Sequence, residues 1–240
     1  MKIRLDQALT RQGLTPTRSQ AESWIKLGKV TVDGRVVTKP GHFVDEAAMI
    51  ALTATEQYVS RAGLKLASVA GKFRVNFADK VVLDVGSSTG GFTDYALQHG
   101  AKLVYAVDVG TDQLHPSLHG HERIELHEKT DIRSFRPAEV PDVVVIDVSF
   151  VSLRDILPHV ATIVGPQALI LAMVKPQFEA NRAQVGSSGV IKNDTVRRTI
   201  LRDFEQWSRN YFVIQDKADS DVKGARGNQE RFYVLRTLVK

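Results

Sequence analysis

The 240-residue sequence contains no cysteine. The chain therefore cannot form disulfide bonds, bind zinc through thiolates or attack a substrate with a cysteine nucleophile. A reducing compartment suits such a composition, and we expect a cytoplasmic protein. Hydrophobic residues make up 43% and charged residues 25% of the sequence, which predicts a packed globular protein rather than a disordered one.

Long apolar runs are also absent. The longest is ALILAMV at 168–174, much shorter than the roughly 18 residues of a membrane-spanning helix. The N-terminal segment MKIRLDQALTRQG is polar and lacks the apolar region of a signal peptide. No amphipathic lytic segment is visible either, so we expect no stable association with a membrane.

The histidine-rich segment HPSLHGH at 115–121 has no acidic or cysteine ligand set beside it. Protein metal sites need several such ligands that converge on one point. We therefore interpret the segment as a solvated loop and expect no bound metal.

Positive charge is concentrated at the beginning of the chain. Residues 1–40 contain eight Lys or Arg and three acids, and this excess of +5 equals the net charge of the whole protein. A localised basic segment is typical of a nucleic-acid-binding surface. The candidate nucleic-acid contacts are Arg4, Arg11, Arg18, Lys26, Lys29 and Arg35.

Two short helices and a hairpin are predicted within residues 1–60. Thr17 and Gln20 have the spacing of a capping box at the start of the second helix. Asp33-Gly34, between alternating apolar residues, is typical of a tight hairpin turn. A charged face of the second helix points away from its apolar stripe and comprises Arg18, Glu22, Lys26 and Lys29.

The segments RLDQAL at 4–9 and TRSQAESWIKLGKVTVDGRVV at 17–37 resemble the S4 RNA-binding module. The resemblance covers roughly the first 60 residues. It implies a small α+β domain that binds structured RNA, which proteins read mainly through shape and backbone. A charged and solvated helical surface is the alternative interpretation.

Continuous apolar runs alternate with helical segments from about residue 80 onward. Such runs are typical of parallel strands covered on both faces, and their alternation with helices predicts an α/β fold with a doubly wound, mostly parallel sheet. Residues 58–80 are predicted to be an amphipathic helix that joins the two parts, so we place the domains at 1–60 and 61–240. The predicted strands cover 81–85, 103–107, 124–128, 143–147 and 168–174, with a closing hairpin at 212–215 and 231–237.

The sharpest local signal is LDVGSSTGGFTD at 83–94, a buried strand followed by a turn of small residues and the start of a helix. Such a turn lets a ligand approach the backbone near the free N–H groups of the helix. The spacing G-x-x-x-G-G matches neither the dinucleotide fingerprint nor the phosphate loop. The candidate cofactor-binding residues here are Asp84, Gly86, Ser87, Gly90, Gly91, Phe92 and Thr93.

An acid, Asp108, follows the second strand of the sheet, 22 residues beyond Gly86. A carboxylate there can accept hydrogen bonds from both hydroxyls of an adenosine ribose. The glycine turn, this acid and the missing phosphate signature together resemble the cofactor site of class I methyltransferases. The resemblance implies S-adenosyl-L-methionine as the cofactor, with Asp131 near the adenine. A helix cap is the alternative interpretation of Asp131.

Four charged residues lie where solvation alone does not explain them. Asp147 ends the run VVVID and Lys175 follows ALILAMV, so both belong to strand ends that converge in a doubly wound sheet. Lys65 lies within SRAGLKL, and Glu230 precedes the run RFYVLRT. Charged groups held close together in an apolar rim are typical of functional sites.

Five motifs, in this order behind an S4-like module, are similar to those of the TlyA family: SRAGLKL, LDVGSSTGGFTD, DVSFVSL, MVKPQFE and KGARGNQE. Members of that family are described both as haemolysins and as ribosomal RNA 2′-O-methyltransferases with an FtsJ/RrmJ-like domain. The resemblance implies a catalytic Lys-Asp-Lys-Glu tetrad at Lys65, Asp147, Lys175 and Glu230. It also implies ribosomal RNA or a ribosomal subunit as partner, with a cytidine ribose of large-subunit RNA as the methylated group.

This tetrad fits a ribose 2′-hydroxyl, which is a poor nucleophile while protonated. Lys175 is the candidate to hold the hydroxyl and favour its alkoxide, as a neutral base or by electrostatic stabilisation. Asp147 would orient Lys175, and Lys65 and Glu230 would position the ribose. The alternatives are a membrane-active haemolysin, which predicts a lytic segment, and a non-catalytic RNA-binding or ribosome assembly factor, which predicts a broken tetrad or turn.

Overall fold

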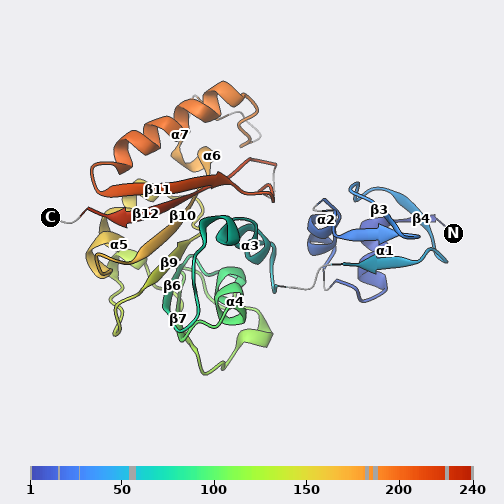
Figure 1. Cartoon of the computed structure of the whole chain (residues 1–240), viewed down its shortest axis with the longest axis horizontal. Coiled ribbons are helices and arrows are strands. Elements are labelled where there is room, and N and C mark those ends of the chain that lie inside the picture. Colours follow the sequence, from blue (N-terminus) through green and yellow to red (C-terminus); the bar gives the residue numbers. More distant parts are fainter. Residues whose placement is uncertain are drawn as a thin grey trace. The chain divides into compact units, whose positions relative to one another are not determined.

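The computed structural model describes residues 2–15, 17–26, 28–53, 58–181, 184–185, 189–224 and 227–238. The chain divides into two compact units, Met1–Arg61 and Ala62–Lys240. Figure 1 shows the first unit in blue and the second from teal to red. The first unit contains the basic segment, and the second contains the predicted sheet.

The first unit combines two short helices with two small antiparallel sheets, β1 with β4 and β2 with β3 and β5. Its elements are β1 (Lys2–Arg4), α1 (Leu5–Arg11), α2 (Arg18–Lys26), β2 (Val30–Val32), β3 (Arg35–Val36), β4 (Phe43–Asp45) and β5 (Ile50–Leu52). Thr17 Oγ1 accepts a hydrogen bond from the Gln20 N–H (3.2 Å) and so caps α2 as predicted. Asp33 and Gly34 have the positive φ angles that a tight hairpin requires, 49° and 78°.

The second unit is built on a seven-stranded, mostly parallel sheet, which confirms the predicted fold class. Its strands are β6 (Val81–Val85), β7 (Leu103–Val107), β8 (Ile124–His127), β9 (Val143–Ile146), β10 (Leu169–Val174), β11 (Phe212–Asp219) and β12 (Arg231–Thr237). The spatial order is β11-β12-β10-β9-β6-β7-β8, and the two pairings of β12 are antiparallel. The chain leaves β6 toward β7 and later returns to β9 on the other side of β6. This reversal creates the crevice at which doubly wound sheets bind ligands.

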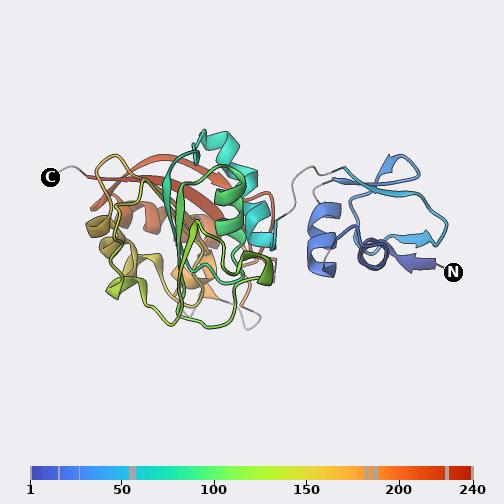
Figure 2. The ribbon, with the colours of Figure 1, turned by 90° about the horizontal axis from the view of Figure 1, so that it is seen from below.

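Helices cover both faces of this sheet (Figure 2). α3 (Arg61–Phe73) and α4 (Gly91–Gln98) lie on one side, and α5 (Leu157–Ile163) and α7 (Asp194–Ser208) lie on the other. A large hydrophobic core lies between the strands and this second pair of helices. The short helices are η1 (Pro116–Leu118), η2 (Ile132–Ser134), η3 (Leu153–Asp155) and α6 (Pro176–Glu179). Among the residues described, no helix has the length and apolar character needed to cross a membrane.

Two local predictions are wrong. The helix predicted over 58–80 spans only Arg61–Phe73, because Arg74 adopts a left-handed φ of 53° and turns the chain away from the helix axis. Lys29 does not share a helical face with Lys26, since α2 ends at Lys26 and Gly28 has a φ of 69°. Lys29 instead lies just before β2, where its side chain is exposed.

Candidate active site

The turn between β6 and α4 depends on two glycines with left-handed backbone. Gly86 has a φ of 81° and Gly90 a φ of 84°, which other residues adopt only with strain. A Cβ on Gly86 would lie 2.7 Å from the carbonyl oxygen of Asp147, and a Cβ on Gly90 would lie 2.5 Å from a methyl carbon of Leu118. Glycine at position 86 therefore lets the turn approach the backbone at the end of β9.

A small cavity of about 140 Å³ opens beside this turn. Asp84 borders it, and its Oδ2 accepts a hydrogen bond from Thr93 Oγ1 (2.7 Å). The other oxygen of Asp84 and the hydroxyl of Ser87, which also borders the cavity, are buried without a partner among the described residues. An unpaired buried polar atom costs roughly 1–3 kcal/mol. The two atoms therefore indicate a polar ligand that completes this cavity.

Asp84 is fully buried. Burial raises the pKa of its carboxyl to about 7, although the hydrogen bond from Thr93 opposes the increase, and the nearby charges of Asp147 and Asp108 add to it. Near neutral pH the carboxyl is thus close to half protonated. A bound cation in the small cavity would favour its charged form.

Asp84→Asn is expected to stabilise the ligand-free protein at alkaline pH. Because the pKa of Asp84 is raised in the folded state, the folded protein holds more protons than the unfolded chain between about pH 4 and pH 7. The free energy of unfolding therefore falls as the pH rises through this range, by up to roughly 4 kcal/mol. The uncharged amide of the variant does not titrate, so the variant does not lose this part of its free energy of unfolding.

Urea unfolding from pH 4.5 to pH 8.5 tests this expectation. The advantage of Asp84→Asn over the wild type should grow with pH. Asp203→Asn, at an exposed position of α7, is the control and should follow the wild type. If the Asp84 variant also follows the wild type at every pH, the buried carboxyl does not titrate as described.

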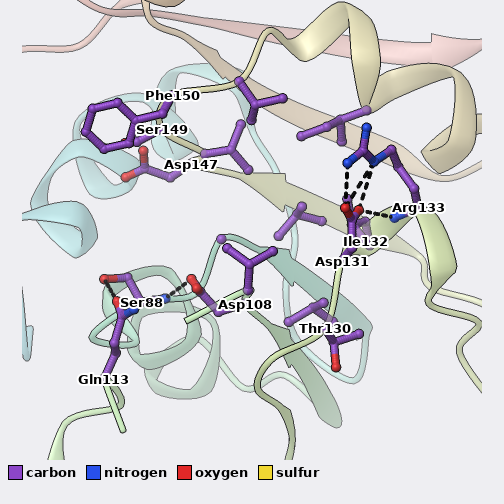
Figure 3. Close-up of a pocket in the computed structure, with 17 residues that line it drawn as sticks. Ser88, Asp108, Gln113, Thr130, Asp131, Ile132, Arg133, Asp147, Ser149 and Phe150 are labelled. Atoms are coloured by element: carbon purple, nitrogen blue, oxygen red, sulfur yellow. Dashed lines mark hydrogen bonds and ion pairs between the residues drawn. The ribbon is translucent and has the colours of Figure 1, made fainter. Parts of the chain in front are cut away.

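A larger cavity of about 470 Å³ lies next to the same turn (Figure 3). Asp108 lines it directly after β7, and its two oxygens accept hydrogen bonds from the N–H groups of Ser88 (2.8 Å) and Gly110 (2.7 Å). These bonds fix the carboxylate at the edge of the cavity. Each carboxylate oxygen has a second lone pair, so Asp108 can still accept hydrogen bonds from ligand hydroxyls.

Asp131 lines the same cavity, away from Ser88 and Gln113 (Figure 3). It accepts a hydrogen bond from the Arg133 N–H (2.9 Å) and so caps η2. Its carboxylate also pairs with the Arg133 guanidinium (2.6 Å), and these bonds lower the pKa of Asp131 to about 2. Asp131 is therefore both a helix cap and a charged part of the cavity wall.

Asp147 and Lys175 meet at the carboxyl ends of β9 and β10. Lys175 Nζ lies 2.5 Å from Asp147 Oδ1 and donates a hydrogen bond to Ser149 Oγ (2.7 Å). The two charged side chains are only 10% and 14% exposed. Removal of water strengthens such a charge pair and fixes its geometry. The ammonium group is therefore held by an ion pair with Asp147 and by a hydrogen bond to Ser149.

Lys65 and Glu230 form a second buried ion pair. Lys65 comes from α3 and Glu230 lies directly before β12, with Nζ and Oε2 2.6 Å apart. Both line a third cavity of about 310 Å³, which Lys175 also borders. The structure thus brings together the four charged residues of the predicted tetrad, as two ion pairs.

The three cavities adjoin one another. The 140 Å³ cavity shares Gly86, Ser88, Asp147 and Ser149 with the 470 Å³ cavity. It shares Ser149 and Lys175 with the 310 Å³ cavity. A ligand that fills the first two cavities would therefore end near Lys175, where a second molecule in the third cavity could meet it. Such an arrangement suits the transfer of a group between two bound molecules.

Not every predicted cofactor residue borders these cavities. Gly90, Gly91 and Thr93 do not; Gly90 permits close packing against Leu118, and Thr93 holds Asp84. Phe92 borders the small cavity, although its ring is buried. Gly90 and Thr93 therefore support the residues that line the site without lining it themselves.

The sequence interpretation missed two polar residues: Ser149, which lines the site, and Glu179, which supports the loop after β9. Glu179 is largely buried and accepts hydrogen bonds from Ser152 Oγ (2.6 Å) and the Leu153 N–H (2.7 Å). It thereby ties the chain that follows β9 to α6. Both residues lie in quoted motifs, DVSFVSL and MVKPQFE, but a serine or a glutamate in a loop carries no signal of its own.

The histidine-rich segment at 115–121 contains the short helix η1. Within the described part of the chain, no group of three or more His, Asp or Glu side chains is placed to hold a metal ion. His115 instead accepts a hydrogen bond from the Ser117 N–H (3.3 Å) and caps η1.

In the first unit, a buried carboxylate organises two of the six candidate RNA contacts. Asp6 is fully buried and accepts hydrogen bonds from Arg4 (3.0 and 2.8 Å) and from Arg18 Nε (2.8 Å). Burial by itself would raise the pKa of Asp6, but the two arginines outweigh it and lower this pKa. The side chains of Arg4 and Arg18 remain 37% and 50% exposed. They therefore offer neighbouring N–H donors at the surface.

The other four candidate contacts are more loosely held. Lys26 Nζ lies 3.7 Å from Glu22, one turn away on α2. All four side chains are exposed: Arg11, Lys26, Lys29 and Arg35.

Comparison with known proteins gives the family. Residues 58–237 match the model of the FtsJ-like methyltransferase, and residues 3–50 match the S4 domain. The chain is 38% identical over 243 residues to the 16S/23S rRNA (cytidine-2′-O)-methyltransferase TlyA of Mycobacterium tuberculosis, with 98% of this chain and 90% of that protein covered. It is 38% identical over 181 residues to the 23S rRNA (cytidine-2′-O)-methyltransferase TlyA of Campylobacter jejuni, with 75% and 71% covered.

A solved structure named "Putative hemolysin from Streptococcus thermophilus" has the same architecture. Its TM-score is 0.73 at 38% identity, and the match covers 98% of this chain and 88% of that chain. The likeness thus includes both units. The protein belongs to the TlyA family, whose FtsJ-like methyltransferase domain follows an S4 domain.

Proposed function

We propose that the protein transfers a methyl group from S-adenosylmethionine to the ribose 2′-hydroxyl of a cytidine in 23S ribosomal RNA. The observation that carries the proposal is Lys175, held by Asp147 and Ser149 where three cavities adjoin. The TlyA relatives from M. tuberculosis and C. jejuni are both named as cytidine-2′-O-methyltransferases of 23S rRNA, and the M. tuberculosis name adds 16S rRNA. The large subunit is therefore the favoured target.

The ammonium group and the ribose hydroxyls of the cofactor fit polar atoms of the site. The unpaired oxygens of Asp84 and Ser87 suit the ammonium group of the amino-acid part. Asp108 suits the ribose hydroxyls, and the 470 Å³ cavity has room for the adenosine. When bound, S-adenosylmethionine supplies an electrophilic methyl group on a sulfonium ion.

The four tetrad residues act on the other reactant. Lys175 would hold the 2′-hydroxyl and favour its alkoxide, the hydroxyl proton being lost to the neutral amine or to water. Bound S-adenosylmethionine would supply the methyl carbon, whose bond to sulfur breaks as the bond to the ribose oxygen forms. Asp147 fixes the position of Lys175 through their ion pair. The Lys65–Glu230 pair borders the third cavity and positions the ribose there. The target nucleotide has to leave its helix to enter this cavity.

Transfer of a labelled methyl group tests the proposal. Large subunits, small subunits, naked ribosomal RNA and a protein mixture receive the enzyme and labelled S-adenosylmethionine in parallel, and labelled nucleosides are then identified. We expect 2′-O-methylcytidine from 23S RNA. Label on a base or on protein, or no label on any RNA, would overturn the proposal; label on 16S RNA alone would correct the target.

Asp6→Asn is expected to weaken RNA binding about tenfold although it makes the protein more positive. The carboxylate holds the guanidinium groups of Arg4 and Arg18 side by side, and paired guanidinium groups bind phosphate through directed hydrogen bonds. Loss of this arrangement should outweigh the gain of one charge. Binding of 23S RNA at several salt concentrations measures the effect.

Asp45→Asn is the matched control, because it makes the same charge change at an exposed position of β4 in the same unit. It should bind RNA at least as tightly as the wild type. Circular dichroism shows whether the Asp6 variant keeps its fold. Arg18→Lys is a second test of the same arrangement, because it keeps the positive charge and loses the Nε–H donor. Tighter binding by a folded Asp6 variant would contradict the proposed arrangement.

A further inference from the structure

The hydroxyl of Ser149 occupies a central place in the site. Of the lining residues that the structure describes, Ser149 alone borders the 470, 140 and 310 Å³ cavities. Its side chain is exposed to these cavities rather than packed in the core. Any methyl group that passes from the cofactor cavities to the third cavity must therefore pass close to this residue.

Ser149 also determines how the Lys175 ammonium is oriented. An ammonium group has three N–H donors. One donates a hydrogen bond to Ser149 Oγ (2.7 Å), whereas Asp147 Oδ1 lies 2.5 Å from Nζ as the partner of an ion pair. The ion pair fixes the position of Nζ and the hydrogen bond to Ser149 fixes one N–H direction, so together they set the directions of the remaining donors, or of the lone pair of the neutral amine. Without Ser149, the Lys175 ammonium could rotate while its ion pair with Asp147 remains.

The backbone around Ser149 is held in place. Phe150 has a left-handed φ of 67°, and its ring packs against Phe178 of α6 with centroids 5.2 Å apart. Beyond it, Glu179 accepts the hydrogen bonds of Ser152 and the Leu153 N–H. A non-glycine residue keeps such a conformation only where its surroundings enforce it. The loop therefore presents the Ser149 hydroxyl in one place.

We propose that Ser149 is a positioning residue for methyl transfer, whose hydroxyl accepts a hydrogen bond from Lys175 and so directs Nζ at the ribose hydroxyl. This inference rests on the proposed function and adds to it a residue outside the tetrad. The role requires the hydroxyl group itself, not only a side chain of suitable size.

Ser149→Thr and Ser149→Val form a matched pair, since the two new side chains have nearly the same shape and differ in the hydroxyl. The exposed position leaves space for the added methyl group. We expect Thr to keep at least a third of the wild-type kcat. Val should lose about 30-fold or more in kcat, because small misplacements of a reacting group cost up to about 100-fold. The KM for S-adenosylmethionine should stay within about threefold of the wild type in both.

Acetylation of Lys175 gives a readout that needs no RNA. The hydrogen bond to Ser149 Oγ holds Lys175 Nζ in place. The Val variant lacks this bond and leaves Nζ free to turn toward the reagent, so Val should be acetylated several-fold faster than Thr at the same pH, as measured by mass spectrometry. Equal kcat and equal acetylation rates in the two variants would overturn the role of Ser149. If the wild type transfers no methyl group, the proposed function fails, while the acetylation rates still decide whether Ser149 holds Lys175.

Discussion

Lys175→Ala should abolish methyl transfer, with a loss in kcat of at least about 1,000-fold, while S-adenosylmethionine still binds. Lys175 Nζ is the positive group that the 140 and 310 Å³ cavities share. A positioned base or charge at the reacting atom contributes about 100- to 10,000-fold. The proposed cofactor contacts, Asp84 on β6 and Asp108 directly after β7, do not involve Lys175 and should remain intact.

Single-turnover transfer and calorimetric titration with S-adenosylhomocysteine measure the two effects. The calorimetric Kd should stay within about threefold of the wild type. Lys102→Ala is the control, because Lys102 is exposed, pairs with Glu139 and lies at the amino end of β7, the opposite end from the site. Substantial turnover by Lys175→Ala would remove Lys175 from the reaction.

Glu230→Ala should lose both activity and stability. Glu230 is only 3% exposed and pairs with Lys65, so its removal leaves a buried ammonium without a counter-charge. Breaking such a pair costs about 3–5 kcal/mol. We expect the free energy of unfolding to fall by this amount and kcat to fall at least about 100-fold. Glu139→Ala, at the exposed pair with Lys102, should cost less than about 1 kcal/mol.

The double variant Lys65→Met/Glu230→Leu separates the two effects. Apolar residues of similar size can replace a buried ion pair with little loss of stability. The free energy of unfolding, measured with urea, should therefore return toward the wild-type value, while the rate of methyl transfer stays low. Recovery of transfer along with stability would mean that the pair only supports the fold.

The sequence predicted the sheet well, because the signals for its strands are local. Apolar runs mark β6, β7, β9 and β10 almost to the residue, since a strand buried on both faces tolerates few polar side chains. The capped start of α2 at Thr17 and the hairpin at Asp33-Gly34 are local as well. The end of α3 was missed because Arg74 is not a residue type that usually adopts a left-handed backbone.

The site was predictable only in part. Asp108, Asp147 and Lys175 follow strands, and the rule that ligands bind at the carboxyl ends of such strands places them together. Lys65 and Glu230 gave no such signal, and their place in a tetrad came from the resemblance to a family. Their contact exists because β12 runs antiparallel beside β10 and brings its start to the site.

The sequence by itself thus determined which segments are strands and helices, where positive charge accumulates, and which acids and lysines stand at strand ends. These properties depend on neighbours within a few positions along the chain. Only the tertiary structure decided that Asp6 is buried beneath Arg4 and Arg18, and that Ser149 holds Lys175 between three cavities. The reason is physical: burial and hydrogen-bond partners depend on groups that the fold brings together from distant parts of the chain.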